Sequence, residues 1–278
     1  MHPVQEHYAR AGTGSAIAER ILAALRDATG ADAPVSPQAL APYDHIHGRG
    51  LLATRDLVAL LEPAAGEEIL DIGCGIGGPA RWIASEARCR VTGVDLTAEF
   101  CAAAAVLTIA CGLGGAVPIH QGSALSLPLP DAAFDKAYSH NVVMNIADKA
   151  GVYREAYRVL KPGGRLVLCH LNAGAGPVQV YPVPWASGPD TSFLATDEET
   201  RRDLGAAGFE ILRFEDTSAR ARAAALAMRR ELEAGGLPAA GPHVFGGNRR
   251  YLEELINNAA ATEAGLIRSV EIVARKPA

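Results

Sequence analysis

A cluster of glycines between two apolar stretches is the part of the sequence with the clearest implications for chemistry. An apolar run ends at Asp71, four glycines follow at positions 73, 75, 77 and 78, and a helical pattern then begins. Glycine allows a tight turn and lets the backbone approach a ligand closely, while the amides of the new helix face that ligand with partial positive charge. This strand–turn–helix is expected to bind a nucleotide-like molecule through Asp71, Gly73, Cys74, Gly75 and Gly77.

The glycine spacing is compatible with more than one nucleotide. Gly73, Gly75 and Gly78 satisfy the G-x-G-x-x-G pattern of dinucleotide-binding dehydrogenases, so a nicotinamide-dependent oxidoreductase is an alternative. Asp71 argues against it, because a carboxylate just before the turn would repel a pyrophosphate. The same carboxylate would tolerate a cofactor that carries an ammonium and a sulfonium group.

A second carboxylate follows at the distance expected of a ribose-binding residue. Asp95 ends another apolar run, 22 residues after Gly73. In a doubly wound sheet this position is the tip of the second strand, beside the glycine turn, where an aspartate accepts hydrogen bonds from both ribose hydroxyls. A helix-capping role for Asp95 or Thr97 is compatible with ribose binding.

Four segments together resemble the motifs of the class I S-adenosylmethionine-dependent methyltransferases, in the family's order and over roughly residues 45 to 215. These segments are 70–78, 94–95, 127–135 and 158–166. Segments 47–54, 144–149 and 181–185 resemble the small-molecule subgroup that includes ubiquinone/menaquinone, sarcosine/dimethylglycine and natural-product methyltransferases. The resemblance implies that the cofactor is S-adenosyl-L-methionine.

The chain departs from this family at the expected adenine site. Where many relatives have Gly-Asp-Ala, it has Gly122, Ser123 and Ala124. Ser123 can accept the adenine hydrogen bond but carries no charge, so adenine recognition is expected to depend more on backbone amides and on Leu96. Cofactor affinity is expected to be lower than in those relatives.

The succession of elements predicts an α/β fold. Helices are expected near 15–28, 49–61, 77–88, 98–111 and 148–160, and strands near 67–72, 90–94, 116–120, 133–138, 165–171, 209–214 and 266–273, with Pro34, Pro37 and Pro42 breaking the chain between the first two helices. Such alternation is typical of a Rossmann-like, doubly wound, mostly parallel sheet covered by helices on both faces. The resemblance implies seven strands with the last one antiparallel.

Two domains follow from this pattern: an N-terminal helical cap at 1–62 and a cofactor-binding core at 63–278. A Gly-, Pro- and aromatic-rich stretch at about 172–195 follows the fifth strand and is expected to be a substrate lid, with a further flap at about 235–250. Arg220, Arg222, Arg229 and Arg230 are interpreted as a solvated helix face.

Methyl transfer to an oxygen or an acidic carbon needs a base, and His140 is the first candidate. It follows the fourth predicted strand, at the edge where the methyl group is expected, and packing or hydrogen bonding to the cofactor's amino-acid end is its alternative role. His170, at the end of the fifth strand, is a weaker candidate. The residues expected to contact the substrate are Tyr43, His47, Asn141, Asn145, Tyr181 and Trp185.

Composition narrows the class of partner. The formal net charge is −5, so no overall field attracts nucleic acid, and the apolar stretches are too short to span a bilayer. The first residues lack an apolar signal core, so we expect a cytoplasmic protein with a small-molecule partner, monomeric or homodimeric. Five cysteines show no C-x-x-C pair and no metal site is expected. A noncatalytic S-adenosylmethionine-binding protein remains the main alternative.

Overall fold

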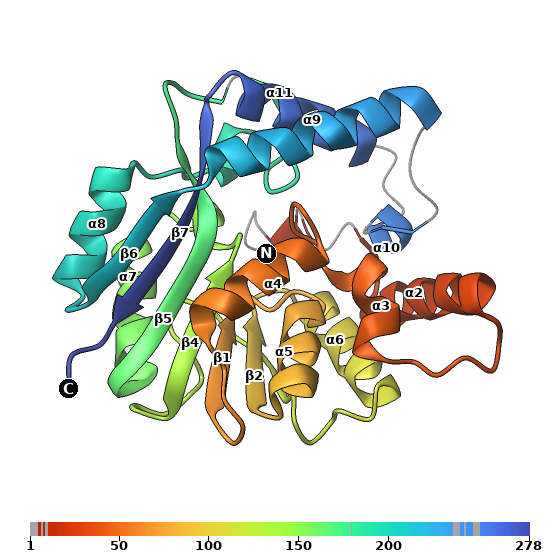
Figure 1. The fold of residues 1–278 in the computed structure, drawn as a ribbon, viewed down its shortest axis with the longest axis horizontal. Coiled ribbons are helices and arrows are strands. Elements are labelled where there is room, and N and C mark those ends of the chain that lie inside the picture. The colour runs from red at the N-terminus through yellow and green to blue at the C-terminus, as the bar shows by residue number, and fades with distance from the viewer. Residues whose placement is uncertain are drawn as a thin grey trace.

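The computed structural model describes residues 5–6, 8, 11–178, 180–235, 240–241, 243–246 and 251–278. These residues form one sheet with helices on both faces, and a pair of late helices lies across one edge of the sheet (Figure 1). The predicted α/β class is confirmed.

The sheet has seven strands in the order β3-β2-β1-β4-β5-β7-β6. The strands are β1 (Glu68–Ile72), β2 (Arg90–Asp95), β3 (Ile119–Gln121), β4 (Phe134–His140), β5 (Leu160–Ala173), β6 (Glu210–Asp216) and β7 (Ile267–Arg275). β7 inserts between β5 and β6 and runs antiparallel to both, while the pairs formed by β1 to β5 are parallel. Parallel strands end at one common edge, and this edge carries the residues expected to do chemistry.

Each face of the sheet is covered by helices that bury an apolar stripe. On one face, α4 (Leu51–Leu61) and α5 (Gly78–Ala87) pack against alternate residues of β1, β4 and β5, as Leu57, Ile83 and Ile69 illustrate. On the other, α7 (Lys149–Val159) and α8 (Asp197–Ala206) pack against the intervening residues, including Leu70. The alternation follows from the two-residue repeat of a strand, which directs neighbouring side chains to opposite faces.

The described part of the N-terminal region adds helices beyond the sheet. α2 (Gly14–Thr29) packs against α6 (Ala98–Ala110), and Gly30 ends α2 with a φ of +94°. The segment where prolines were expected to break the chain forms a further helix, α3 (Pro37–Asp44). Proline at the first position of a helix lacks only an amide that would be unpaired there, and Ser36 caps this helix by accepting from the amide of Ala39. The domain boundary after residue 62 stays a prediction.

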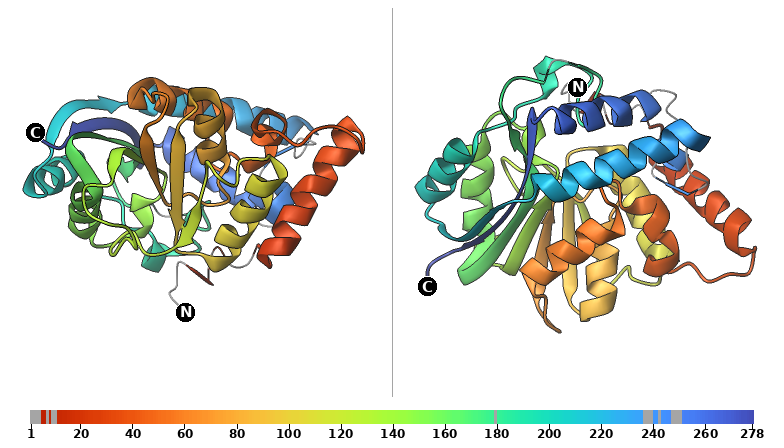
Figure 2. Two further views of the ribbon diagram at one scale, coloured as in Figure 1. Left: turned by 90° about the horizontal axis from the view of Figure 1, so that it is seen from below. Right: turned by 45° about the horizontal axis from the view of Figure 1, so that its top comes forward.

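The C-terminal part forms a roof over the carboxyl edge of the strands. α9 (Ser218–Gly235) and α11 (Tyr251–Glu263) lie side by side above that edge, and the short helix α10 (His243–Gly246) lies near α2 and α3 (Figures 1 and 2). The flap predicted at 235–250 falls largely outside the described residues. Of the four arginines interpreted as a solvated face of α9, Arg222 and Arg230 are exposed, whereas Arg220 pairs with Asp56 and Glu271 and Arg229 pairs with Glu263.

Candidate functional site

The glycine turn lies between β1 and α5 and requires glycine at its first position. The amide of Gly73 donates to the carbonyl of Val94 over 2.7 Å, and Gly73 has a φ of +83°. A Cβ on Gly73 would lie 2.3 Å from Cγ2 of Val142. Both the backbone conformation and the crowding exclude a side chain, so the turn remains open toward the cavity.

Asp95 lies at the tip of β2 and contacts this turn. Its carboxylate accepts from the amides of Gly75 over 2.9 Å and Thr97 over 2.8 Å. Burial raises the pKa of Asp95, and these amide hydrogen bonds oppose that shift. A carboxylate has more acceptor sites than two amides occupy, so it can still receive the hydroxyls of a ribose.

Asp71 is the second carboxylate of the turn, and it is buried. The hydroxyl of Tyr138 donates to its Oδ2 over 2.7 Å. Burial raises the pKa of Asp71 to about 7, although the hydrogen bond from Tyr138 acts in the opposite direction. Near neutral pH, Asp71 therefore exchanges between a neutral and an anionic form, and a nearby cation favours the anion.

The other residues predicted to contact the cofactor have distinct positions. Leu96 and the segment 122–124 line the cavity beside Asp95, and the hydroxyl of Ser123 accepts from the amide of Leu125 over 3.2 Å. Cys74 also lines the cavity, and burial raises the pKa of its thiol well above the ordinary value, so it is protonated. Gly77, with a φ of +80°, is the N-cap of α5 and is not among the lining residues.

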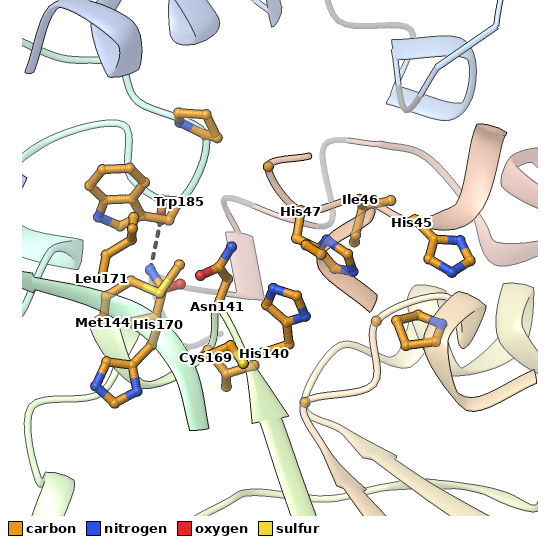
Figure 3. A pocket seen from close by; sticks show the side chains of 18 of the residues that line it. His45, Ile46, His47, His140, Asn141, Met144, Cys169, His170, Leu171 and Trp185 are labelled. Carbon is orange, nitrogen blue, oxygen red and sulfur yellow. Dashed lines mark hydrogen bonds between the residues drawn. The ribbon is translucent and has the colours of Figure 1, made fainter. Parts of the chain in front are cut away.

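One continuous cavity of about 1070 Å³ extends from the glycine turn to the roof. Its floor is the carboxyl edge of β1, β2, β4 and β5, and its walls come from the N-terminal region, α9, α11 and the segment 172–195 after β5. This segment keeps the name lid, although its role as a lid stays a prediction. Figure 3 shows His47 and His140 facing each other in this cavity, with Trp185 and Met144 on the opposite side of Asn141. Of the predicted substrate contacts, His47, Asn141, Asn145 and Trp185 line it.

Two histidines from distant parts of the chain stack in the cavity. The ring centroids of His47 and His140 are 3.7 Å apart, with an angle of 15° between the ring planes. Nε2 of His47 is 3.2 Å from the hydroxyl of Thr54. Burial lowers the pKa of His140 to about 3 and the pKa of His47 well below its ordinary value, so both rings are neutral at physiological pH. Nδ1 of each ring is buried and, within the described part of the chain, makes no hydrogen bond.

A third cavity histidine, His45, was not singled out from the sequence. Its Nδ1 is 2.8 Å from Oδ1 of Asp44, and its Nε2 is buried without a hydrogen-bond partner among the described residues. The other carboxylate oxygen of Asp44 accepts from Arg81 of α5 over 2.9 Å. Arg81 is fully buried and also donates to the carbonyl of Ile76. This ion pair ties the N-terminal region to the helix that follows the glycine turn, and no local sequence pattern signals it.

His170 and Asn145 lie toward the lid. Burial lowers the pKa of His170 to about 4, and its Nδ1 has no hydrogen-bond partner among the described residues. Asn145 has a structural role: its amide donates to the carbonyls of Trp185 and Thr191 over 2.7 and 3.0 Å, and it accepts from the hydroxyl of Tyr8. Asn145 thus fixes the lid to the core.

Two predicted substrate contacts point elsewhere. Tyr43 is packed in the apolar cluster between α2, α3 and α6, with its hydroxyl 3.4 Å from the carbonyl of Ala24, and it does not line the cavity. Tyr181 packs against the cluster beneath the lid and is likewise not a lining residue. We therefore remove both from the candidate substrate site. Their orientation depends on packing partners that are remote in sequence.

The described residues contain no group of three or more His, Cys, Asp or Glu side chains arranged to hold a metal ion. The described helices also include none that is long and apolar enough to cross a membrane. The described lining of the cavity includes the carboxylates at the glycine turn and the neutral imidazoles of His47 and His140, and also the charged residues Arg49 and Glu271.

Comparisons with known proteins agree with this geometry. Residues 70–168 match the family model described as "Methyltransferase domain". Sterol 24-C-methyltransferase of Eremothecium gossypii is 41% identical over 100 residues, covering 36% of this chain and 27% of that protein. Phosphoethanolamine N-methyltransferase 3 of Arabidopsis thaliana is 32% identical over 132 residues, covering 45% of this chain and 26% of that protein. The chain thus spans about a quarter of the length of these two relatives.

A solved structure extends the similarity over most of the chain. The [4+2]-cyclase SpnF is 29% identical, with a TM-score of 0.65 and coverage of 81% of each chain. The matching domain model, the curated relatives and the antiparallel β7 inserted next to β5 all agree. Residues 70–168 thus match a methyltransferase domain, and the chain as a whole is similar to the class I S-adenosylmethionine-dependent methyltransferases.

Proposed function

We propose that the protein transfers a methyl group from S-adenosylmethionine to nitrogen, oxygen or carbon of a small metabolite. The observation that carries this proposal is one continuous cavity that joins the glycine turn and Asp95 to the His47–His140 pair. A nucleotide cofactor on the turn and an acceptor beside the histidines would then be neighbours. Its setting is proposed to be the cytoplasm, as a monomer or homodimer, with no nucleic-acid or membrane partner, in keeping with a net charge of −5.

The residues of the turn fit this cofactor. Asp95 would accept the ribose hydroxyls, the open backbone at Gly73 and Gly75 would lie against the amino-acid end, and Asp71 would provide a negative charge. Leu96 and Ser123 would contact the adenine. The bound cofactor supplies a methyl group on a positively charged sulfur, which is activated without further help from the protein.

The protein itself would align the acceptor with the methyl group and accept a proton from the acceptor where one must be removed. Holding two reactants in a reactive geometry can lower a barrier by up to ~7–11 kcal/mol in the best cases. His140 is held neutral by burial, with Nδ1 lacking a protein partner, so it is able to accept a hydrogen bond or a proton from the acceptor. Nitrogen acceptors need only alignment in their neutral form, whereas a hydroxyl uses His140.

Two other functions are kept as alternatives. The similarity to SpnF, described as a [4+2]-cyclase, favours an enzyme of this fold that binds the cofactor and catalyses ring formation in an apolar cavity. A noncatalytic cofactor-binding protein would bind S-adenosylhomocysteine and show no turnover. The match of residues 70–168 to a methyltransferase domain gives the nicotinamide alternative no support.

Thermal unfolding with S-adenosylmethionine, S-adenosylhomocysteine and NADH is the first test. A ligand at one hundred times its Kd should stabilise the protein by about 2.7 kcal/mol. We expect a shift with both adenosyl compounds and none with NADH. Transfer of labelled methyl from S-adenosylmethionine to an acceptor panel then separates the enzyme from the noncatalytic protein. A shift with NADH alone would overturn the proposal.

A further inference from the structure

We propose that the methyl acceptor is a bulky, uncharged and mostly apolar metabolite that carries a hydroxyl group and binds beneath α9 and α11. This inference rests on the proposed methyl transfer and specifies its acceptor. It follows from the size of the cavity, from the residues of its roof and from the pairing of its charges.

The cavity is larger than one ligand requires. Its volume of about 1070 Å³ lies just above the range of ~300–1,000 Å³ that is usual for sites of drug-sized ligands. The cofactor would occupy the part above the glycine turn. The remaining part, between the histidines, the lid and the roof, is left for an acceptor much larger than an amino acid.

The α9 wall of this part is built from small side chains at helical spacing. Ala221, Ala224, Ala225 and Met228 line the cavity, which is the i, i+3, i+4, i+7 pattern of one helix face. Ala223, on the opposite face, is exposed. Alanines on the inner face leave space where larger residues would fill the cavity. This face is therefore suited to a flat, apolar surface.

α11 completes the roof with a mixed but uncharged face. Tyr251, Leu255, Asn258, Ala259 and Thr262 line the cavity, again at the spacing of one helix face. The lid adds Trp185, whose indole nitrogen donates to the hydroxyl of Ser192 and whose ring is almost wholly buried. The roof and lid together offer apolar contact with few polar groups.

The cavity offers no free cation to an anionic acceptor among the residues that the structure describes. Arg49 is the one arginine or lysine of its described lining, and its guanidinium lies 2.6 Å from Oδ2 of Asp56. A phosphate or carboxylate would need several donors of this kind and would have to displace an existing ion pair. Phosphorylated acceptors are therefore disfavoured.

The carboxylates are equally committed, which disfavours a cationic acceptor. Glu271 accepts from Arg220 over 2.8 Å, and Asp148 caps α7 by accepting from the amide of Gly151. Asp44 pairs with Arg81, and Asp71 and Asp95 belong to the proposed cofactor site. Asp190, the remaining acidic residue of the described lining, is exposed to solvent in the lid. A buried ammonium would lack a counter-ion, at considerable cost.

A hydroxyl group on the acceptor matches the imidazole nitrogens of His47 and His140 in the cavity. Nδ1 of His140 and Nδ1 of His47 are buried without hydrogen-bond partners within the described residues, and both rings line the cavity. A neutral imidazole nitrogen accepts from an O–H group, or donates to its oxygen, without any charge in the ligand. The acceptor's hydroxyl would satisfy one of these nitrogens, and its oxygen is the proposed site of methylation.

The test uses the full chain saturated with S-adenosylhomocysteine and a neutral polycyclic dye, Nile red. We expect the dye to fluoresce on binding, to be displaced by 17β-estradiol, and to be displaced at least about tenfold more weakly by estradiol 17-sulfate, because the sulfate would be buried without a cation. Ala225→Phe should weaken dye binding by about tenfold or more by filling the cavity. Ala223→Phe, on the exposed face, is the matched control and should bind like the wild type.

The outcomes separate the two proposals. No thermal shift with S-adenosylhomocysteine would overturn the proposed function itself. When the thermal shift with S-adenosylhomocysteine is normal, three results would overturn only the proposed acceptor class. These are competition by estradiol 17-sulfate as strong as that by estradiol, failure of both steroids to displace the dye, and equal dye binding by Ala225→Phe and Ala223→Phe. The shift with S-adenosylhomocysteine also shows that each variant is folded, and Ala225→Leu serves as a smaller change should Ala225→Phe fail this check.

Discussion

His47 and His140 stack face to face at a centroid distance of 3.7 Å, although 93 positions separate them in the sequence. One comes from the N-terminal region and the other from the tip of β4, beside the glycine turn. The contact therefore exists only when the N-terminal region is packed against the core. Because both rings are neutral, the pair presents hydrogen-bonding nitrogens to the cavity without a charge.

Replacing His140 should separate binding from turnover. We expect His140→Ala to lower the rate of methyl transfer by about 10²–10⁴-fold if the acceptor is a hydroxyl, since that is the usual contribution of a general base. Binding of S-adenosylhomocysteine, measured by calorimetry, should change much less. His120→Ala is the control, because His120 does not line the cavity. Equal turnover in wild type and His140→Ala would remove His140 from the mechanism.

Binding of S-adenosylmethionine should release a proton near neutral pH. The pKa of Asp71 is raised to about 7 by burial, and a bound cation lowers it by favouring the anion. Below about pH 7, binding must therefore expel the proton, so affinity should increase as the pH rises through 7 and then level off. Calorimetry at pH 6.5 in two buffers of different ionisation enthalpy measures this release.

Two variants check the assignment to Asp71. Asp71→Asn should abolish the proton release. Tyr138→Phe removes a hydrogen bond that lowers the pKa of Asp71, so it should move the pH dependence to higher pH. An unchanged proton release in Asp71→Asn would show that another group titrates.

The Asp44–Arg81 ion pair should be costly to break from one side. Arg81→Ala leaves the carboxylate of Asp44 buried with His45 as its remaining side-chain partner, and we expect a loss of about 3–5 kcal/mol in the free energy of unfolding. The double variant Asp44→Leu/Arg81→Leu should lose less than the sum of the losses of Asp44→Leu and Arg81→Leu, which a double-mutant cycle of denaturant unfolding measures. Additive losses would mean that the two side chains contribute independently. Arg202→Ala, at an exposed pair with Asp203, is the control and should cost ~1 kcal/mol or less.

Asn145 should control the mobility of the lid. Asn145→Ala removes the donors to the carbonyls of Trp185 and Thr191, and leaving these buried acceptors unpaired should cost about 1–3 kcal/mol. Limited proteolysis within 172–195 should become faster than in the wild type. Asn141→Ala, which keeps both lid contacts, should be cleaved at the wild-type rate. Similar cleavage of the two variants would contradict the role given to Asn145.

The sequence by itself determined the fold class and the part of the candidate site formed by the glycine turn and Asp95. The alternation of apolar runs and helical patterns predicted the parallel sheet, and the residues from Asp71 to Gly78 predicted the turn, because local spacing fixes strand, turn and helix. Asp95 could be placed beside that turn, since parallel strands end at a common edge. The helix at Pro37–Asp44 was missed because prolines were interpreted only as breaks.

Only the tertiary structure decided the second part of the candidate site, where segments far apart in the sequence meet. The stacking of His47 on His140, the pairing of Asp44 with Arg81 and the turning of Tyr43 and Tyr181 away from the cavity each depend on contacts between segments far apart in the chain. The sequence likewise could not identify the inner face of α9, because alanines at helical spacing occur both on solvent-exposed faces and on faces that line a cavity. Local sequence encodes which element forms, whereas the packing of distant elements decides which side chains meet.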